Sequence, residues 1–203
     1  HGRGLAFSCL ILFCVKLEIF LIVYMNAAIL NGGKSRRMGQ DKAMLPVNGE
    51  AIIDRLFTLL NSSFNSVAIV GADDDIYQGI GVLGGLHSAL KKFAQKACFV
   101  SACDYPGINT SFIEYMKVQY EPSFDAVLPV WKGHVQSLCG IYSPSTLVII
   151  EQQIAKKEYK LGDMLKKARV KLVRLDKKQH FYSEHLLLNM NTISEYEQYI
   201  SQS

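Results

Sequence analysis

The sequence predicts one α/β domain of three layers, in which a mostly parallel central sheet lies between two layers of helices. The main observation is that short apolar runs alternate with longer amphipathic runs from Met25 onward, as they do in strand–helix–strand units. No internal repeat or low-complexity linker divides this region. The chain has 203 residues, of which 49% are hydrophobic and 20% are charged, and this size and composition suit a single globular core.

The first half of this region is expected to hold three strands and two helices. Residues 27–30 (AAIL) form a short apolar run, residues 66–71 (SVAIVG) end at a glycine, and residues 97–102 (ACFVSA) are again apolar. Each of these runs is predicted to be a buried strand. Residues 50–61 carry isoleucine and leucine at helical spacing, and residues 83–93 follow a polar loop as a second helix.

The second half continues the alternation. Asn109 or Thr110 is expected to cap a helix over residues 109–120, and Pro144 suits the first turn of a helix over residues 144–157. The remaining predicted elements are strands over 124–130, 170–175 and 185–191, helices over 161–168 and 194–200, and turns followed by an apolar run over 131–143.

Glycine or polar residues follow several of the predicted strands. They are Gly32 and Gly33 after the first strand, residues 73–75 (three aspartates) after the second, Asp104 after the third, and Asn189 with Asn191 at the end of the last. Open α/β sheets bind ligands outside the carboxyl ends of their strands. If the strands are parallel, all of these residues lie at one edge of the sheet.

Charge and cysteine content exclude some classes of partner and site. The formal net charge is +4, and no dense run of Lys and Arg with interleaved aromatic residues is present, so nucleic acid is not an expected partner. The five cysteines are Cys9, Cys14, Cys98, Cys103 and Cys139. None of them forms a C-x-x-C pair, so neither a zinc site nor a thioredoxin-type motif is indicated, and reduced cysteines in a cytoplasmic protein are expected.

The segment over residues 1–24 is interpreted separately from the domain over residues 25–203. It is strongly apolar, but Lys16 and Glu18 interrupt the run, whereas a membrane span needs about 20 apolar residues with few charges. It also lacks the basic start and cleavage site of a signal peptide. We interpret Met25 as the natural start and residues 1–24 as an upstream extension; a membrane anchor is the alternative.

The stretch LNGGKSRRMGQDK (residues 30–42) is expected to bind phosphate, although it is not a P-loop. A Walker A motif ending at Gly33-Lys34-Ser35 needs a glycine at the position of Ala28, and the G-x-G-x-x-G spacing is also absent. Two adjacent glycines let backbone N–H groups approach a phosphate. Ser35, Arg37 and Lys42 add donors and positive charge for a triphosphate whose pyrophosphate leaves. The alternative is a glycine turn followed by a basic surface loop.

Further motifs follow this stretch in a fixed order. They are Asp75 ahead of residues 81–85 (GVLGG), residues 103–106 (CDYP), residues 137–143 (SLCGIYS) and residues 189–195 (NMNTISE). Together with residues 30–42 the chain resembles the molybdenum cofactor guanylyltransferases, a family of nucleotidyltransferases, over roughly residues 26–200. It departs from the family pattern at Asn31 (usually Ala), at Val82, Ser137 and Ile193 (each usually Pro), and at Ser194 (usually Glu).

The resemblance implies a Rossmann-like nucleotidyltransferase fold and a specific reaction. The enzyme would transfer GMP from GTP to the terminal phosphate of molybdopterin, the pterin of the molybdenum cofactor, and would release pyrophosphate with Mg²⁺ as cofactor. It further implies cytoplasmic molybdenum cofactor biosynthesis, with GTP and molybdopterin as partners and molybdoenzyme chaperones downstream. Neither nucleic acid nor a membrane is an expected partner, as the charge pattern and the interrupted apolar run already indicate.

The resemblance also implies the residues of the site. Arg37, Lys42 and Asp104 would be catalytic, and Asp104 would be the metal ligand, since Mg²⁺ prefers hard oxygen ligands. The nucleotide would contact Leu30, Asn31, Gly32, Gly33, Lys34, Ser35, Lys42, Asp75 and Gly84. Asp75 would read guanine, because a carboxylate accepts two parallel hydrogen bonds and guanine offers adjacent donors on N1 and the 2-amino group.

Asn189 and Asn191 would bind the acceptor, holding the pterin phosphate or a metal-bound water. Each of these roles has a structural alternative. In the structural alternative, Asp104 only caps the end of a strand and Asp75 is part of a solvated acidic loop. Asn189 and Asn191 then form an ordinary turn ahead of the last helix.

Two other functions stay open on the sequence alone. One is a related transferase, either a cytidylyltransferase of the same pterin or a nucleotidyltransferase for another small phosphorylated acceptor. The other is a nucleotide-binding domain without catalysis, which the departures at Asn31, Val82, Ser137 and Ile193 keep open. Asn31 stands beside the phosphate-binding glycines, where it would either crowd the nucleotide or add a hydrogen bond.

Overall fold

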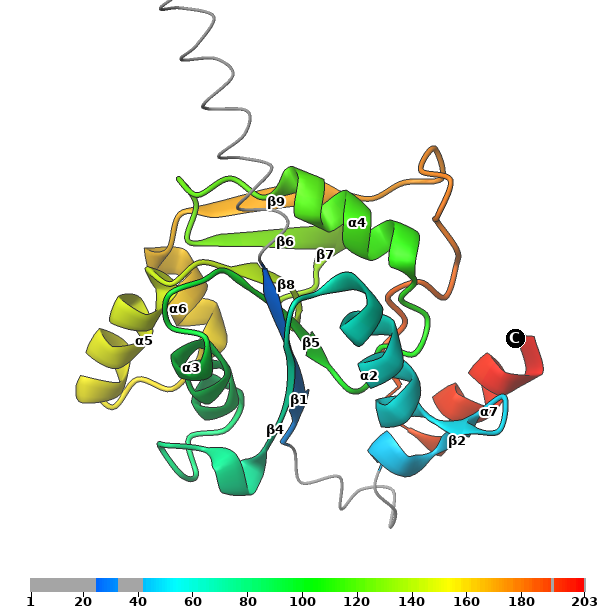
Figure 1. Cartoon of the computed structure of the whole chain (residues 1–203), viewed down its shortest axis with the longest axis horizontal. Helices are drawn as coiled ribbons and strands as arrows, with labels where there is room; N and C mark the ends of the chain where they lie inside the picture. The colour runs from blue at the N-terminus through cyan, green and yellow to red at the C-terminus, as the bar shows by residue number, and fades with distance from the viewer. Residues whose placement is uncertain (1–24, 33–41, 191, 203) are drawn as a thin grey trace, which may run out of the picture.

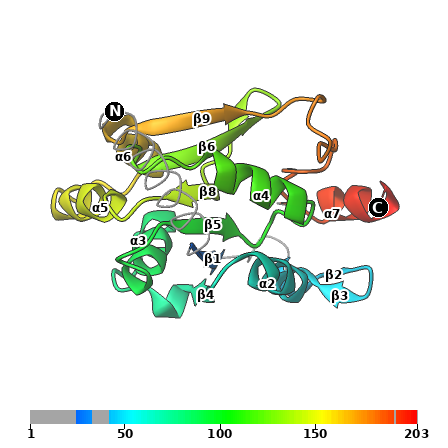
Figure 2. The same ribbon diagram turned by 45° about the horizontal axis from the view of Figure 1, so that its top comes forward.

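A mixed sheet forms the centre of the computed structural model, which describes residues 25–32, 42–190 and 192–202. Within these residues seven strands form the central sheet, in the order β4-β1-β5-β8-β6-β7, with β9 paired to β6 (Figures 1 and 2). The strands are β1 (Asn26–Asn31), β4 (Val67–Gly71), β5 (Cys98–Ala102), β6 (Ala126–Trp131), β7 (His134–Val135), β8 (Cys139–Tyr142) and β9 (Val170–Arg174). A separate ladder joins β2 (Pro46–Val47) to β3 (Glu50–Ala51).

Most strands of the central sheet run in one direction. β1 is parallel to both β4 and β5, and β9 is parallel to β6. β8 is antiparallel to both β5 and β6, so β6 runs in the same direction as β5. The carboxyl ends of β1, β4, β5, β6 and β9 therefore lie at one edge, which confirms the predicted mostly parallel sheet. The two exceptions, β7 and β8, come from the region over 131–143 that combines turns with an apolar run.

The alternation of side chains along β1 explains the three layers. Ala27 and Ile29 belong to one buried cluster, while Ala28 and Leu30 belong to another on the opposite face, as the period of two in a strand requires. Helices α2 (Ile52–Ser63) and α4 (Thr110–Gln119) cover the first face. Helices α3 (Val82–Lys92), α5 (Thr146–Ala155) and α6 (Leu161–Lys167) cover the second (Figure 1).

The predicted capping of α4 is also confirmed. Asn109 adopts an extended backbone, and its side-chain oxygen accepts a hydrogen bond from the backbone N–H of Phe112 at 2.9 Å. This bond satisfies one of the donors that the first turn of a helix leaves without a backbone partner. No helix among residues 25–32, 42–190 and 192–202 has the length and apolar character needed to cross a lipid bilayer.

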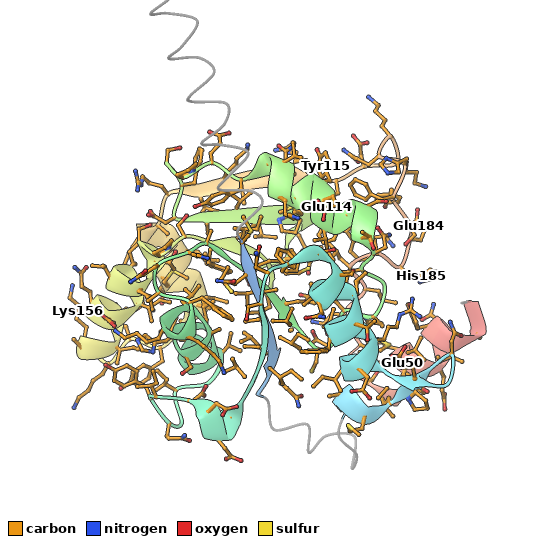
Figure 3. All side chains as sticks on the ribbon, in the orientation of Figure 1. Glu50, Glu114, Tyr115, Lys156, Glu184 and His185 are labelled. Carbon is orange, nitrogen blue, oxygen red and sulfur yellow. The ribbon has the colours of Figure 1, made fainter. Side chains whose placement is uncertain are left out.

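The predicted strand over residues 185–191 is wrong. Residues 184–187 form turns and residues 188–190 have no regular secondary structure: Leu186 N–H bonds to the carbonyl of Ser183, and Leu188 N–H bonds to that of His185. The run of leucines is buried, as predicted, but a short apolar run alone does not distinguish a strand from other buried backbone. Figure 3 shows Glu184 and His185 on this segment, which leads from β9 toward the last helix.

The last helix, α7 (Ile193–Gln202), closes this end of the domain. Thr192 and Glu195 form a capping box, in which Glu195 N–H bonds to Thr192 Oγ1 and Thr192 N–H bonds to Glu195 Oε2. The hydroxyl of Tyr196 donates to the carbonyl of Pro46 at 2.5 Å. Since Pro46 begins β2, α7 supports the chain just after η2 (Lys42–Met44), where the glycine-rich stretch ends.

Candidate active site

The carboxyl ends of β1, β4 and β5 lie next to one another at one edge of the sheet. The backbone N–H of Cys103 donates to the carbonyl of Leu30 at 3.2 Å, which links the end of β1 to the residue before Asp104. Gly32 lies against the start of the loop after β4, since a Cβ at this position would be 3.4 Å from the backbone nitrogen of Ala72. Gly32, the aspartate loop and the start of the Asp104 loop thus share this edge.

The rest of the glycine-rich stretch lies largely outside the described residues. This holds for Gly33, Lys34, Ser35 and Arg37, and the structure gives Lys42 only as the first residue of η2. The side chain of Asn31 is described, and its oxygen accepts a hydrogen bond from Cys103 Sγ at 3.5 Å. Asn31 therefore ties the end of β1 to the end of β5.

Asp75 packs its carboxylate against the start of α3. A Cβ on Gly84 would lie 3.0 Å from Asp75 Oδ2 and 2.8 Å from the carbonyl of Tyr77, and a Cβ on Gly85 would lie 3.7 Å from Asp75 Oδ1. Gly84 is therefore required because any side chain there would displace the carboxylate and its loop. The predicted pair Asp75 and Gly84 is brought together at the edge that holds Leu30 and Gly32.

The environment of Asp75 is unusual for a loop carboxylate. Its Oδ1 atom is buried and accepts no hydrogen bond from the described residues. Burial, and then the charge of Asp74, raise the pKa of Asp75, while His87 acts to lower it. A buried acceptor without a partner costs about 1–3 kcal/mol, so this oxygen is well placed to accept a hydrogen bond from a ligand.

Helix α3 holds the loop that follows Asp75. The backbone N–H of Ile76 donates to Ser88 Oγ at 2.9 Å, and the Gln78 side chain donates to the carbonyl of Asp75 at 2.9 Å. The ring of Tyr77 meets His87 edge-on at 4.9 Å, and His87 Nε2 lies 3.3 Å from Glu151 of α5. These contacts fix the loop from several directions, so the position of the Asp75 carboxylate is set by the helix layer.

Asp104 follows β5, and its backbone joins it to the segment ahead of α7. The backbone N–H of Met190 donates to the carbonyl of Asp104 at 3.1 Å, which places the neighbouring residue Asn189 beside this loop. Gly107 lets the loop after β5 approach the segment that carries His185, since a Cβ on Gly107 would lie 2.1 Å from the carbonyl oxygen of His185. Asp104 and Asn189, both expected at this edge of the sheet, thus lie on neighbouring backbone segments; Asn191 lies outside the described residues.

Two residues without a predicted role contribute to this part of the edge. The hydroxyl of Tyr105 donates to Gln136 Oε1 at 3.2 Å. Burial first, and then Cys139 and Asp104, raise the pKa of Tyr105, while a hydrogen bond from the Asn189 side chain lowers it. The sequence signal was present but weak, because Tyr105 is the variable position of C-D-x-P and Gln136 directly precedes Ser137-Leu138-Cys139-Gly140.

The described residues contain no cluster of three or more His, Cys, Asp or Glu side chains arranged to hold a metal ion. They do offer two oxygen donors at the edge, the carboxylate of Asp104 and the side-chain carbonyl of Asn189. Asn189 Oδ1 is buried and accepts no hydrogen bond from the described part of the chain.

Known proteins resemble this chain over most of its length. A family model described as MobA-like NTP transferase domain matches residues 27–173. A probable molybdenum cofactor guanylyltransferase of Carboxydothermus hydrogenoformans is 30% identical over 185 residues, covering 85% of this chain and 93% of the relative. One of Pelotomaculum thermopropionicum is 34% identical over 183 residues, covering 84% and 89%.

Solved structures confirm the fold. The crystal structure of molybdopterin-guanine dinucleotide biosynthesis protein A from Archaeoglobus fulgidus superposes with a TM-score of 0.75 at 23% identity, covering 88% of this chain and 98% of that one. The resemblance seen in the sequence motifs is confirmed by the family match, which spans most of the sheet and the edge that carries Leu30, Asp75 and Asp104. The chain belongs to the MobA-like NTP transferase family of nucleotidyltransferases.

Proposed function

We propose that this protein transfers GMP from GTP to the terminal phosphate of molybdopterin, forming the guanine dinucleotide of the cofactor and pyrophosphate. The observation that carries the proposal is the meeting of Leu30, Gly32, Asp75, Gly84 and Asp104 at one edge of the sheet. Two relatives that match 84–85% of the chain are each named as a probable molybdenum cofactor guanylyltransferase, and this supports the choice of nucleotide and acceptor.

Asp75 is the residue proposed to recognise the base. Its Oδ1 atom is buried without a hydrogen-bond donor among the described residues, and Oδ2 lies against Gly84. Guanine presents two adjacent N–H donors, from N1 and the 2-amino group, and a carboxylate accepts such a pair. Cytosine and uracil present no such adjacent pair, so the same carboxylate disfavours CTP and UTP. Leu30 and Asn31 would border the same nucleotide.

The triphosphate is proposed to lie along the glycine-rich stretch. Gly32 stands at its start, and Gly33, Lys34, Ser35, Arg37 and Lys42 would supply backbone, hydroxyl and cationic donors. Such donors stabilise the negative charge that moves onto pyrophosphate as the bond to the α-phosphate breaks. The roles of Arg37 and Lys42 rest on the sequence motif and on its place directly after β1.

Asp104 and Asn189 fit a Mg²⁺ site. Mg²⁺ takes hard oxygen ligands and often binds through one or two protein groups together with phosphates and waters, so the Asp104 carboxylate and Asn189 Oδ1, which accepts no hydrogen bond from the described residues, are the proposed protein ligands. When bound, Mg²⁺ would neutralise phosphate charge and polarise the α-phosphate. A carbonyl oxygen does not bind a phosphate oxygen, so Asn189 Oδ1 suits the cation or its water. The pterin phosphate is then left to Asn191 and the amide nitrogen of Asn189.

The test is a transfer assay on the full chain. GTP labelled at the α-phosphate is incubated with molybdopterin and Mg²⁺, and both labelled dinucleotide and pyrophosphate are measured. The proposal expects equal amounts of the two products, with CTP and UTP much poorer donors. Transfer from CTP in preference to GTP would instead show a cytidylyltransferase. GTP binding with no turnover in the presence of the pterin would show a non-catalytic nucleotide-binding domain.

A further inference from the structure

The direction of the Asp75 carboxylate depends on the backbone on both sides of this residue. Asp75 Oδ1 accepts no hydrogen bond from the described residues, so no such bond to this oxygen holds the carboxylate in place. The backbone of Asp75 is extended, with φ −66° and ψ 120°, and its N–H donates to the carbonyl of Ala72 at 3.4 Å. The remaining determinant is the orientation of the next peptide unit, which joins Asp75 to Ile76.

Side chains bind both polar groups of this peptide unit. The N–H of Ile76 donates to Ser88 Oγ at 2.9 Å, and the carbonyl of Asp75 accepts from Gln78 Nε2 at 2.9 Å. A peptide unit is planar, so hydrogen bonds on its two opposite sides fix the orientation of the whole plane. They thereby fix the ψ angle of Asp75, and with it the direction in which the side chain leaves the backbone.

Burial makes Ser88 the stronger of the two partners. The Ser88 residue is only 7% exposed, and its bond to Ile76 is partly buried. Gln78 and its bond are exposed, so water can take its place. Without the Ser88 hydroxyl the N–H of Ile76 would lose its acceptor, and a backbone donor in that position turns to find another partner. Such a turn rotates the peptide unit and moves the carboxylate of Asp75.

Helix α3 contacts Asp75 at two successive turns. Gly84 and Ser88 are four residues apart and therefore lie on the same face of the helix. Gly84 leaves space for the carboxylate, since a Cβ there would lie 3.0 Å from Asp75 Oδ2. One turn further along, Ser88 holds the peptide unit that follows Asp75. The glycine limits where the carboxylate can lie, and the serine sets the angle at which it lies there.

Resting on the proposed function, we propose that Ser88 is a positioning residue for base specificity. By holding the peptide unit between Asp75 and Ile76, it directs both carboxylate oxygens of Asp75 toward the two adjacent N–H donors of guanine. Two parallel hydrogen bonds require the carboxylate plane to align with both donors, whereas a rotated carboxylate keeps only one of them. Ser88 acts through Asp75, because its oxygen faces the N–H of Ile76.

ITP provides the test, because hypoxanthine keeps the N1–H of guanine and lacks the 2-amino group. The ratio of GTP affinity to ITP affinity therefore measures the second hydrogen bond, and calorimetry on the full chain with Mg²⁺ gives both values. Wild type is expected to bind GTP roughly 10- to 100-fold more tightly than ITP. Ser88→Ala should reduce this ratio to about threefold or less. A wild-type ratio in Ser88→Ala would overturn the proposal.

Variants at Ser88 and Gln78 rank the two hydrogen bonds. Ser88→Thr keeps an oxygen acceptor for the N–H of Ile76 and should retain most of the GTP preference over ITP. Gln78→Ala removes the exposed bond and should lower that preference less than Ser88→Ala does. Equal losses in the Ala and Thr variants of Ser88, or a larger loss in Gln78→Ala, would contradict the role given to the Ser88 hydroxyl.

Thr146→Val is the matched control for a lost hydroxyl. It keeps the shape of a fully buried side chain but removes the hydroxyl that donates to the carbonyl of Asp125 at 2.6 Å. This variant should lower the thermal midpoint and keep the wild-type preference for GTP over ITP. Ser88→Ala should unfold close to wild type, since alanine favours a helix more than serine does. An equal loss of preference in Thr146→Val would show a general effect of stability and would overturn the proposal.

A double-mutant cycle shows whether Ser88 acts through Asp75. Once Asp75 is alanine, Ser88→Ala should not change the ratio of GTP to ITP affinity any further; independent, additive effects would contradict positioning. These measurements do not use the pterin. A wild-type protein that binds GTP and ITP equally would overturn the role of Ser88, whether or not GMP is transferred. A protein that discriminates as expected but transfers no GMP would contradict the proposed function and still support the role of Ser88.

Discussion

The backbone N–H of Met190 donates a hydrogen bond of 3.1 Å to the carbonyl of Asp104. This bond joins the loop after β5 to the segment ahead of α7, the two parts of the chain that carry Asp104 and Asn189. Asp104 follows a central strand, whereas Met190 lies in a segment without regular secondary structure just ahead of α7. Because a backbone pair makes the link, it does not depend on either side chain. Substitutions of the Asp104 and Asn189 side chains can therefore test their proposed roles in GMP transfer with little disturbance of the fold.

Asp104→Asn should abolish transfer and leave the protein folded. The substitution keeps the size of the side chain and the backbone bond to Met190, but it removes the negative charge proposed to hold Mg²⁺. We expect the rate of pyrophosphate release to fall at least about 100-fold, because charge stabilisation at the reacting phosphates is a major part of catalysis. Asp73→Asn, on an exposed neighbouring loop residue, is the control and should stay within about twofold of wild type. A rate near wild type in Asp104→Asn would remove this residue from the site.

Gly84→Ala should disturb the Asp75 loop, while Gly85→Ala should not. The added methyl at Gly84 would lie 2.8 Å from the carbonyl of Tyr77, whereas at Gly85 the nearest atom is 3.7 Å away. Overpacking of this kind costs about 1–3 kcal/mol, but alanine otherwise favours a helix over glycine by about 1 kcal/mol. Thermal unfolding should therefore show a lower midpoint for Gly84→Ala and an equal or higher one for Gly85→Ala. Equal midpoints for the two variants would contradict the close contact.

Asn31→Ala should have only a small effect on GTP use. The structure turns the side-chain oxygen of Asn31 to Cys103 Sγ at 3.5 Å, and an S–H···O bond contributes only about 0.5–1 kcal/mol. We expect a stability loss within that range and a KM for GTP within about twofold of wild type. A large change in the KM would show that the side chain contacts the nucleotide.

Asp125 should make stability depend on pH in the acid range. Its carboxylate accepts hydrogen bonds from Ser145 Oγ at 2.6 Å and from Arg169, through the backbone N–H at 2.8 Å and the guanidinium at 3.1 and 3.2 Å. Burial alone would raise the pKa of Asp125, but the hydrogen bonds from Arg169 and Ser145 outweigh it and lower the pKa from 3.8 to about 2.

Because this pKa is depressed in the folded state, the stabilisation is complete above about pH 4 and disappears as the pH falls through about 2. Its size is about 2 kcal/mol at neutral pH, from the difference between the two pKa values. Asp125→Asn should therefore be less stable than wild type at pH 7, and the difference in free energy of unfolding should shrink as the pH approaches 2. A difference that stays constant down to pH 2 would contradict this account.

The regular elements of the fold could be predicted because their patterns are local. The alternation of Ala27 and Ile29 with Ala28 and Leu30 sends successive side chains to opposite faces of β1, and Asn109 caps α4 as its residue type indicates. The expectation that Gly32, Asp75 and Asp104 share an edge needed only parallel strands, which the structure supplies on that side of the sheet.

What the sequence could not predict depends on long-range contacts. The sequence pattern predicts Asn189 at the end of a strand. In the structure no strand is present there, and Asn189 lies at the edge of the sheet because Met190 N–H bonds to the carbonyl of Asp104. The hydrogen bond from Tyr105 to Gln136 joins two separate segments, so no local pattern indicates it. The orientation of the Asn31 side chain likewise depends on a residue far away in the sequence, Cys103, whose Sγ donates to Asn31 Oδ1.

The most direct test of the account compares GTP with CTP as donors to molybdopterin in the full chain, for wild type, Asp75→Ala and Asp73→Ala. Loss of hydrogen bonds to a charged group costs about 1.5–3 kcal/mol, so Asp75→Ala should reduce the preference for GTP by roughly 10- to 100-fold. Asp73→Ala should keep the wild-type preference. If wild type prefers CTP, guanylyl transfer is contradicted; if Asp75→Ala retains the full preference for GTP, the guanine is read elsewhere.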